Sequence, residues 1–336
     1  MEEMMKIHEK SLPIGSPRIH FPQDEGAHPD ALIEWWYGNF SLTDSKGREY
    51  EAVTAYFAPG LKIVALSDPE EQRFHQEISF STRDFAQGML NLRWGDSDHW
   101  FRSDQNALSY GLESRGNNIG LNLNISSKKP PLLVGGDGLV EWTEGNSYYY
   151  SLTRLQVEGQ IELSGRKVDV KGTGWMDHQW MNAMGMPGWD WFCAQLDDDT
   201  EIIFWQIVKP DETVKSRGIT IMSADNLIYH GQDIAFEKLD SWVSRQSGNK
   251  YGILWRVKEK TRGLDLEIRA KYSEQEIRMF DVLPETNFAF WEGSTTISGY
   301  LDGKKVAGKG YAELLRAPLN AEVTLVALLA AGSNPV

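Results

Sequence analysis

Short runs of alternating apolar and polar residues, separated by Gly, Asp and Ser, recur along the chain. Residues 40–57, 160–172 and 296–314 each read as strand, turn, strand, and the last two have turns at Ser164-Gly165 and Asp302-Gly303. Long helical periodicity is scarce, and we predict only short helical turns at residues 31–36 and 68–76. The pattern therefore predicts a mostly antiparallel all-β protein.

Two motifs occur twice, in the same order. Residues 35–44 (WWYGNFSLTD) and 189–198 (WDWFCAQLDD) both read Trp, any residue, aromatic, with a later Leu and Asp at matching positions. Residues 170–177 (VKGTGWMD) and 306–313 (VAGKGYAE) share Val-x-Gly-x-Gly-aromatic-x-acid. We place the seam in residues 178–188, which are rich in Met, Gly and Pro. This predicts two closed or nearly closed β domains, residues 1–180 (with 1–20 as an extended lead-in) and residues 181–336.

Composition narrows the class of protein. The length of 336 residues suits two domains, and a net charge of −14 argues against nucleic acid and anionic lipid as partners. Cys193 is the single cysteine, which excludes an intramolecular disulfide and a thiolate zinc site. The acidic N-terminus is unlike a signal peptide, and the apolar residues 323–332 are too few to span a membrane and read as a last strand or docked helix. We expect a cytoplasmic protein without an integral membrane segment.

Residues 172–198 (GTGWMDHQWMNAMGMPGWDWFCAQLDD) place four tryptophans around Asp177, His178 and Asp190. Strand alternation puts Asp190 at the start of an otherwise apolar row, where burial would raise the pKa of its carboxyl and favour the neutral form. A neutral carboxylic acid can protonate a carbon–carbon double bond, and indole faces stabilise the resulting cation. The alternative for Asp190 alone is a structural role, with hydrogen bonds that hold a loop. Asp177 and His178 nearby favour a functional site.

Two other acids stand beside tryptophans. Glu34 follows His28 and precedes two tryptophans, although a salt bridge to an arginine would also explain it. Glu292 follows Trp291 and could equally anchor its hairpin. The candidate catalytic residues are Asp190, Asp177, His178 and Glu34, and the candidate substrate-binding residues are Trp36, Tyr37, Trp175, Trp180, Trp189, Trp191, Trp291 and Glu292.

Motifs of several enzyme classes are missing from the sequence. It contains no G-x-S-x-G, H-E-x-x-H, paired C-x-x-C or EF-hand loop, and its Gly-x-Gly pairs lack the third glycine of a dinucleotide site. The seven histidines are scattered along the sequence and give no support to a metal triad. The sequence does not exclude a triad of residues brought together by the fold. We therefore expect a protein that uses neither a cofactor nor a metal.

Five ordered segments resemble the signature segments of the AttH-like/carotenoid 1,2-hydratase family: 28–42 (HPDALIEWWYGNFSL), 172–180 (GTGWMDHQW), 188–198 (GWDWFCAQLDD), 290–299 (FWEGSTTISG) and 308–314 (GKGYAEL). The resemblance spans Phe21 to Leu315. It implies two lipocalin-like antiparallel β-barrels in tandem, packed together, and cofactor-free chemistry on hydrophobic isoprenoids or polyenes. Carotenoid hydratases use a carboxylic acid to protonate a terminal double bond and then add water. Fungal relatives include a flavonoid hydratase and decalin-forming Diels–Alderases.

Three functions fit these observations. The first is an enzyme that binds an isoprenoid or polyene between the barrels and catalyses a proton-initiated addition or cyclisation. There Asp190 or Asp177 gives the proton, and His178 or Glu34 orients water or removes a proton. The second is a pericyclase, in which the pocket only folds a polyene into a reactive shape and polar groups activate one carbonyl by hydrogen bonding. The third is a carrier of an apolar ligand, against which the acid–indole neighbours argue, because a carrier needs no acid in its pocket.

Overall fold

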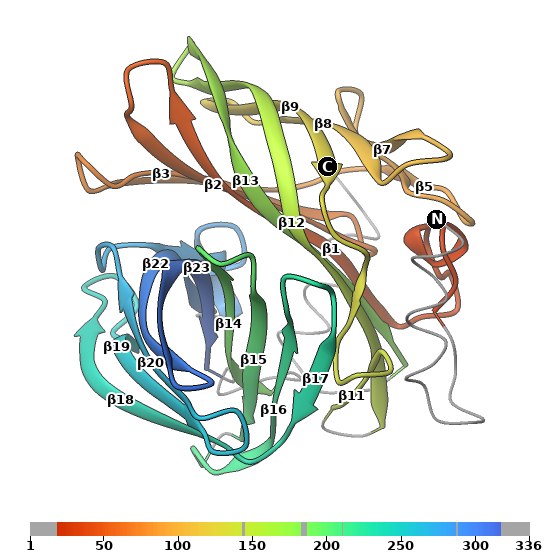
Figure 1. The fold of residues 1–336 in the computed structure, drawn as a ribbon. Helices are drawn as coiled ribbons and strands as arrows, with labels where there is room; N and C mark the ends of the chain where they lie inside the picture. The colour runs from red at the N-terminus through yellow and green to blue at the C-terminus, as the bar shows by residue number, and fades with distance from the viewer. Residues whose placement is uncertain (1–18, 143–144, 183–186, 210, 287, 317–336) are drawn as a thin grey trace. The chain divides into compact units, whose positions relative to one another are not determined.

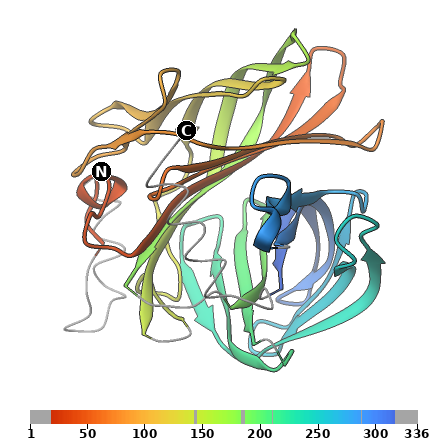
Figure 2. The same cartoon turned by 180° about the vertical axis from the view of Figure 1, so that it is seen from behind.

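The structure, a computed structural model, describes residues 19–142, 145–182, 187–209, 211–286 and 288–316. These residues form two antiparallel sheets, each strongly curled into a half-barrel (Figures 1 and 2). The prediction of an all-β protein with two barrel-like antiparallel sheets is confirmed. Nearly all of the lead-in at residues 1–20, and the whole apolar run at residues 323–332, lie outside the described residues. Within the described ranges, no helix has the length and apolar character needed to cross a membrane.

The first sheet runs in the order β4-β3-β2-β1-β13-β12-β9-β8-β7-β6-β5, and β10 and β11 also pair with β12. The 3-10 helix η1 (Gln23–Glu25) precedes it. Its strands are β1 (Ile33–Asp44), β2 (Glu49–Phe57), β3 (Leu61–Asp68), β4 (Arg73–Phe80), β5 (Arg83–Phe85), β6 (Asn91–Trp94), β7 (Asp98–Asp104), β8 (Ser109–Arg115), β9 (Ile119–Ser127), β10 (Leu132–Leu133), β11 (Leu139–Glu141), β12 (Asn146–Leu163) and β13 (Arg166–Met181).

The second sheet runs in the order β17-β16-β15-β14-β23-β22-β20-β19-β18, and β21 also pairs with β22. The 3-10 helices η2 (Met279–Asp281) and η3 (Pro284–Thr286) lie between β21 and β22. Its strands are β14 (Gly188–Leu196), β15 (Glu201–Val208), β16 (Val214–Met222), β17 (Ile228–Gly231), β18 (Ile234–Val243), β19 (Lys250–Glu259), β20 (Leu264–Ala270), β21 (Glu276–Arg278), β22 (Ala289–Leu301) and β23 (Lys304–Leu315).

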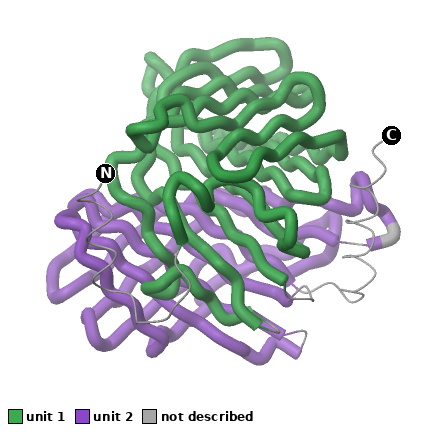
Figure 3. The backbone as a smooth tube through the Cα atoms, turned by 90° about the vertical axis from the view of Figure 1, so that its right-hand side faces the viewer, with its two compact units in different colours: residues 1–184, 326–336 green, residues 185–325 purple. Residues whose placement is uncertain are grey.

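The sequence repeat is a repeat of strand pairing. The chain divides into two compact units between residues 184 and 185 (Figure 3). In each unit the first long strand pairs with the last one, β1 with β13 and β14 with β23. The registers correspond, because Tyr37 is opposite Asp177 in the first unit and Trp191 is opposite Glu313 in the second. Both repeated motifs therefore occupy equivalent places in the two sheets.

The paired glycines of β13 and β23 permit close strand packing. A Cβ atom on Gly172 would lie 1.9 Å from the backbone oxygen of Ser41, and one on Gly308 would lie 2.4 Å from that of Gln195. A side chain at either position would overlap the backbone of the neighbouring strand. The glycines of the Gly-x-Gly motifs therefore allow neighbouring strands to pack closely.

The two predicted hairpin turns are confirmed, and the prediction of two helical turns is wrong. Ser164-Gly165 and Asp302-Gly303 have positive φ at both residues, as two-residue hairpin turns require. Residues 33–36 belong to β1 and not to a helix, and residues 69–72 form a turn between β3 and β4. Both segments were too short for periodicity to separate helix from strand, and the bulky aromatic residues of β1 favour a strand.

The concave face of each sheet carries a large aromatic core. In the first unit this core includes Trp36, Phe40 and Trp100. In the second it includes Phe192 and Trp255. Alternate residues of each strand therefore face either this core or the opposite side of the sheet. The face that a candidate residue occupies therefore decides which other residues it can contact.

Candidate functional site

Three adjacent strands of the first unit place polar and aromatic side chains on the core face. His178 of β13 is flanked by Trp36 of β1 and Tyr150 of β12, which are its register partners on either side. Two residues along each strand, the same face carries the next row. That row consists of Glu34, Trp180 and Tyr148.

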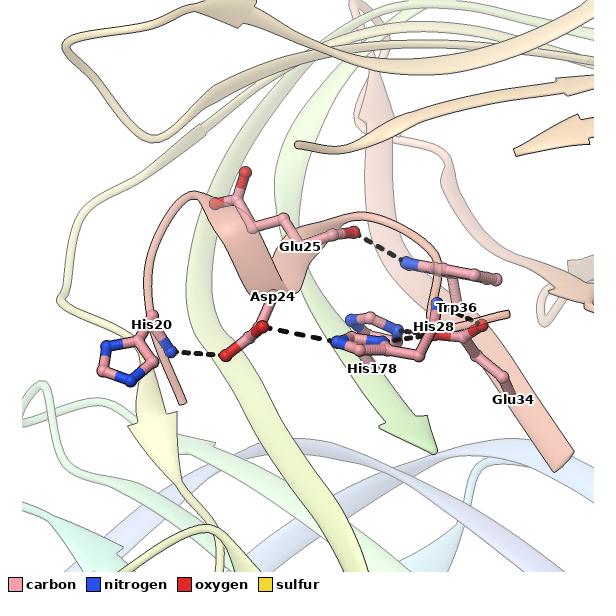
Figure 4. Close-up of polar contacts among 7 residues, drawn as sticks. All are labelled: His20, Asp24, Glu25, His28, Glu34, Trp36 and His178. Atoms are coloured by element: carbon pink, nitrogen blue, oxygen red, sulfur yellow. Dashed lines mark hydrogen bonds and ion pairs between the residues drawn. The ribbon is translucent and has the colours of Figure 1, made fainter. Parts of the chain in front are cut away.

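The segment before β1 adds further polar groups to this face (Figure 4). Nδ1 of His28 lies 2.8 Å from Oε1 of Glu34, and its Nε2 lies 3.4 Å from Oδ1 of Asp24. The His28 ring also stacks on Trp180, with centroids 4.0 Å apart and an interplanar angle of 5°. Asp24, His28 and Glu34 thus form a continuous chain of hydrogen bonds.

Glu34 accepts hydrogen bonds from both histidines. Nε2 of His178 lies 2.9 Å from the same Oε1 atom, and the backbone N–H of His28 donates to both carboxylate oxygens at 3.2 and 3.0 Å. The Glu34 residue is only 1 % exposed. A buried carboxyl with so many donors is suited to be an ionised acceptor.

The pKa values of the cluster move in different directions. Burial raises the pKa of Glu34, but hydrogen bonds from His178 and His28 outweigh it and hold the pKa below its usual value. Burial lowers the pKa of His28, but hydrogen bonds to Asp24 and Glu34 prevail and raise it to about 9. For His178, complete burial prevails over the contact with Glu34 and lowers the pKa. At neutral pH, His28 is therefore an imidazolium and His178 a neutral imidazole.

The neutral His178 ring has one donor and one acceptor nitrogen. Because the Glu34 carboxylate can only accept, Nε2 of His178 carries the hydrogen and Nδ1 has a free lone pair. Nδ1 is buried and makes no side-chain hydrogen bond within the part of the chain that the structure describes, while the backbone oxygen of Asp24 also acts on the ring. The ring stacks on Trp36 with centroids 4.5 Å apart, and the Trp180 centroid is 4.7 Å away. This is a carboxylate–imidazole pair that can take up a proton beside two indoles.

The same groups are possible metal ligands. Atoms of His28, Glu34 and His178 lie within 4.8 Å of one another, a donor set that zinc and similar ions accept. Both imidazole nitrogens, however, are within hydrogen-bond distance of one Glu34 oxygen. An ion held by all three would have to replace both of these hydrogen bonds and the His28 proton.

Asp177 lies beside His178 in the sequence but on the opposite face of the sheet. Its oxygens accept hydrogen bonds from Tyr149 (2.7 Å), Ser151 (2.5 Å) and Trp175 (2.7 Å). These donors come from β12 and β13, so the carboxylate joins the two strands. The structure therefore does not bring Asp177 and His178 together.

Asp190 lies in the second unit and does share the core face with Phe192, as alternation predicted. Its carboxylate oxygens are 2.8 Å from Nη2 of Arg316 and 2.7 Å from Nε2 of Gln206. The guanidinium contact was not anticipated, because Arg316 follows the paired strand β23 and carried no signal in the sequence near Asp190.

The remaining candidate residues lie on different faces of the two sheets. Glu34, Trp36, His178 and Trp180 meet on the core face of the first sheet, whereas Tyr37 and Trp175 share the opposite face with Asp177. In the second unit Trp291 belongs to the core, and its Nε1 donates to the Ser273 oxygen at 2.7 Å. Alternation places Trp189, Trp191 and Glu292 on the side of the second sheet away from its core.

Sequence reasoning missed a carboxyl pair on that side. Glu313 is directly opposite Glu292 in the β22–β23 register, and their side chains hydrogen-bond. Nε1 of Trp189 donates to Oε1 of Glu313 at 2.7 Å. Burial prevails over both contacts and raises the pKa of Glu313. Since two carboxylates cannot hydrogen-bond without a proton, the pair holds one. The signal was the repeat itself, which made Glu313 the counterpart of Asp177.

Comparisons with known proteins identify the family and the fold. A family model described as AttH-like matches residues 13–316. A crystal structure of a candidate AttH protein from Nitrosomonas europaea superposes with a TM-score of 0.78 at 26 % identity, covering 91 % of this chain and 99 % of that one. Kievitone hydratase from Nectria haematococca gives 0.73 at 20 % identity, with 90 % and 94 % covered. CghA in complex with Sch210972 gives 0.61 at 12 %, with 92 % and 98 % covered. The search of curated proteins found no match.

Proposed function

This chain belongs to the AttH-like family, and we propose that it is an enzyme acting on a hydrophobic isoprenoid or polyene. The proposed reaction starts with protonation of a carbon–carbon double bond and ends with hydration or ring closure. The fold shared with kievitone hydratase and with CghA, which was solved with the small molecule Sch210972, supports a small-molecule substrate. Fold similarity alone does not fix the reaction, so the proposal depends on the site.

The observation that carries the proposal is the buried Glu34–His178 pair between two indoles. Protonation of an alkene creates a carbocation, which tryptophan faces stabilise. The reaction then needs a base that takes a proton either from the attacking water or from the cation itself. Nδ1 of His178 is such a base, and the Glu34 carboxylate stabilises the imidazolium that forms.

The proton donor is the second element of the proposal. Asp177 and Asp190 remain our candidates for this role, although Asp177 lies on the opposite face of the sheet from His178, Asp190 belongs to the second unit, and each is hydrogen-bonded to several groups. To act as a donor, either carboxyl would first have to gain a proton and give up a bond to a neighbour. His28, as an imidazolium at neutral pH, supplies positive charge to the cluster and keeps Glu34 ionised.

Solvent deuterium tests the reaction class. The purified protein is incubated in D2O with squalene, lycopene and farnesol, and the products are analysed by mass spectrometry and NMR. We expect deuterium on a product carbon, and loss of that product with His178→Asn. A new product without carbon-bound deuterium would replace the proposal with a pericyclase. Recovery of a tightly bound but unchanged ligand would replace it with a carrier.

A further inference from the structure

A second polar group lies on the other side of η1, inside the same half-barrel. Asp24 and Glu25 are adjacent, but their side chains point in different directions, with Asp24 toward His28 and Glu25 away from it (Figure 4). Oε1 of Glu25 accepts from Nη1 of Arg102 at 2.6 Å and from the hydroxyl of Tyr110 at 2.9 Å. Glu25 is fully buried, and the Arg102 guanidinium balances its charge.

Two polar atoms in this region are buried without a side-chain partner. The hydroxyl of Tyr150 makes no hydrogen bond to a described residue, and Oε2 of Glu25 makes none to a described side chain, while the backbone N–H of Leu90 also acts on the Glu25 carboxyl. Both residues are 0 % exposed. Burial and the nearby Glu25 charge raise the pKa of the Tyr150 phenol well above its usual value, so the hydroxyl stays protonated. Leaving such buried groups unpaired is unfavourable, which favours an occupant that pairs with both.

We propose that Glu25 and Tyr150 form a binding subsite for the hydroxyl group of a neutral, otherwise apolar ligand. This inference rests on the proposed function in one respect, which is that the ligand binds within the first half-barrel. A hydroxyl can donate to Oε2 of Glu25 and accept from Tyr150 at the same time. A ketone or an ether can only accept, so it would leave Oε2 of Glu25 unpaired. Because Arg102 already neutralises Glu25, the subsite gains nothing from a charged ligand.

The surroundings of Tyr150 place this subsite next to the Glu34–His178 pair. The Tyr150 ring contacts Phe21 edge-on at 4.8 Å between centroids and His178 edge-on at 5.4 Å. The subsite therefore has an apolar wall on one side and the proposed base on the other. An alcohol bound there would have its carbon skeleton among aromatic rings, as an isoprenoid alcohol requires.

Three matched ligands test the subsite by binding alone, without turnover. Farnesol, its methyl ether and the hydrocarbon farnesene are titrated into the full-length protein by isothermal calorimetry. We expect farnesol to bind at least about tenfold more tightly than the ether or hydrocarbon, since a hydrogen-bonding site rejects analogues that leave its groups unpaired. Tyr150→Phe should reduce this preference to about threefold or less. Tyr50→Phe, which removes a buried tyrosine hydroxyl elsewhere in the core, should preserve it.

A stability measurement keeps the proposal testable if the affinities are weak. Without ligand, Tyr150→Phe should not lower the melting temperature, because the lost hydroxyl had no partner in the folded chain. A lower melting temperature with no discrimination among the three ligands would mean that a resident water satisfies these atoms, and would overturn the proposal. Equal affinities in the wild type, or no binding of farnesol, would also overturn it. These results do not depend on His178, whose substitution tests the proposed reaction.

Discussion

Oε1 of Glu34 lies 2.9 Å from Nε2 of His178, and 144 residues separate the two in the sequence. The antiparallel pairing of β1 with β13 brings them to the same face of the sheet. The same oxygen also accepts a hydrogen bond from Nδ1 of His28. The other ring nitrogen of His28 lies within hydrogen-bond distance of Asp24. The protonation of each member therefore depends on its neighbour, and this coupling is the basis of the first two predictions.

Removing either member of the Glu34–His178 pair should reduce turnover. We expect His178→Asn and Glu34→Gln to lower kcat by about 10²–10⁴, the usual contribution of a positioned general base, with little change in KM. Steady-state kinetics on the substrate found by the deuterium experiment measures the effect. His99→Asn is the matched control, because His99 is a partly buried histidine of the same unit outside the site. Unchanged kcat in both variants would rule out the pair as the base.

The stability of the protein should decrease as His28 loses its proton. Its pKa in the folded protein is about 9, above the ordinary value of 6.5, so folding favours the protonated form. The resulting stabilisation is complete below about pH 6.5 and is lost as the pH rises through about 9. Urea denaturation at pH 7 and pH 10 should show a larger loss for wild type than for His28→Gln. An NMR titration that gave His28 a pKa near 6.5 would contradict this prediction.

Asp177→Asn and Asp190→Asn test the proposed proton donors. Each substitution should leave the fold intact but lower stability by about 1–3 kcal/mol, because donors that faced a carboxylate lose their partner. If either aspartate is the acid, its variant should also lose turnover by several powers of ten. Circular dichroism, chemical denaturation and kinetics separate the two effects. Full activity in both variants would assign Asp177 and Asp190 to structure.

The Glu292–Glu313 pair should make stability fall as the pH rises. Burial raises the pKa of Glu313 above its ordinary value of 4.5, so the folded protein binds a proton that the unfolded chain releases. That contribution is present below about pH 4.5 and is lost as the pH rises through the folded pKa. Denaturation at pH 4 and pH 8 should show that Glu313→Gln becomes more stable relative to wild type at the higher pH. An opposite trend would mean that both carboxyls are ionised.

Gly172→Ala should destabilise the first sheet. The added Cβ would lie 1.9 Å from the Ser41 backbone oxygen, so β1 and β13 must move apart. Overpacking of this kind costs about 1–3 kcal/mol or more. Thr173→Ala, on the neighbouring residue of β13, serves as the control and should cost less. Equal melting temperatures for the two variants would show that the strands adjust without strain.

Local patterns in the sequence predicted much of the architecture. Alternation and turn residues identified the hairpins at Ser164-Gly165 and Asp302-Gly303. The repeat identified the equivalent strands, because the aromatic and glycine positions follow from close pairing within each sheet. Such features depend on residues close together in the chain or on a spacing that recurs. They can therefore be predicted from a single sequence.

The site was only partly predictable because its contacts are distant in sequence. Glu34 and Trp36 come from one motif and His178 and Trp180 from another, and the register that brings the four side chains together is visible only in the structure. Asp177 and His178 are neighbours in the chain, yet alternation sends them to opposite faces. The Arg316 contact to Asp190 joins the ends of paired strands 126 residues apart, which no local pattern encodes.

The short η1 turn has a consequence for how such a protein can change. Asp24 and Glu25 occupy consecutive positions, one tuning the charge of His28 and the other joined to Arg102 and Tyr110. A backbone shift of this turn would displace both side chains together. Reactivity and ligand choice would then be inherited as a linked pair of traits, and mutants selected for a new ligand should often carry an altered pH optimum as well.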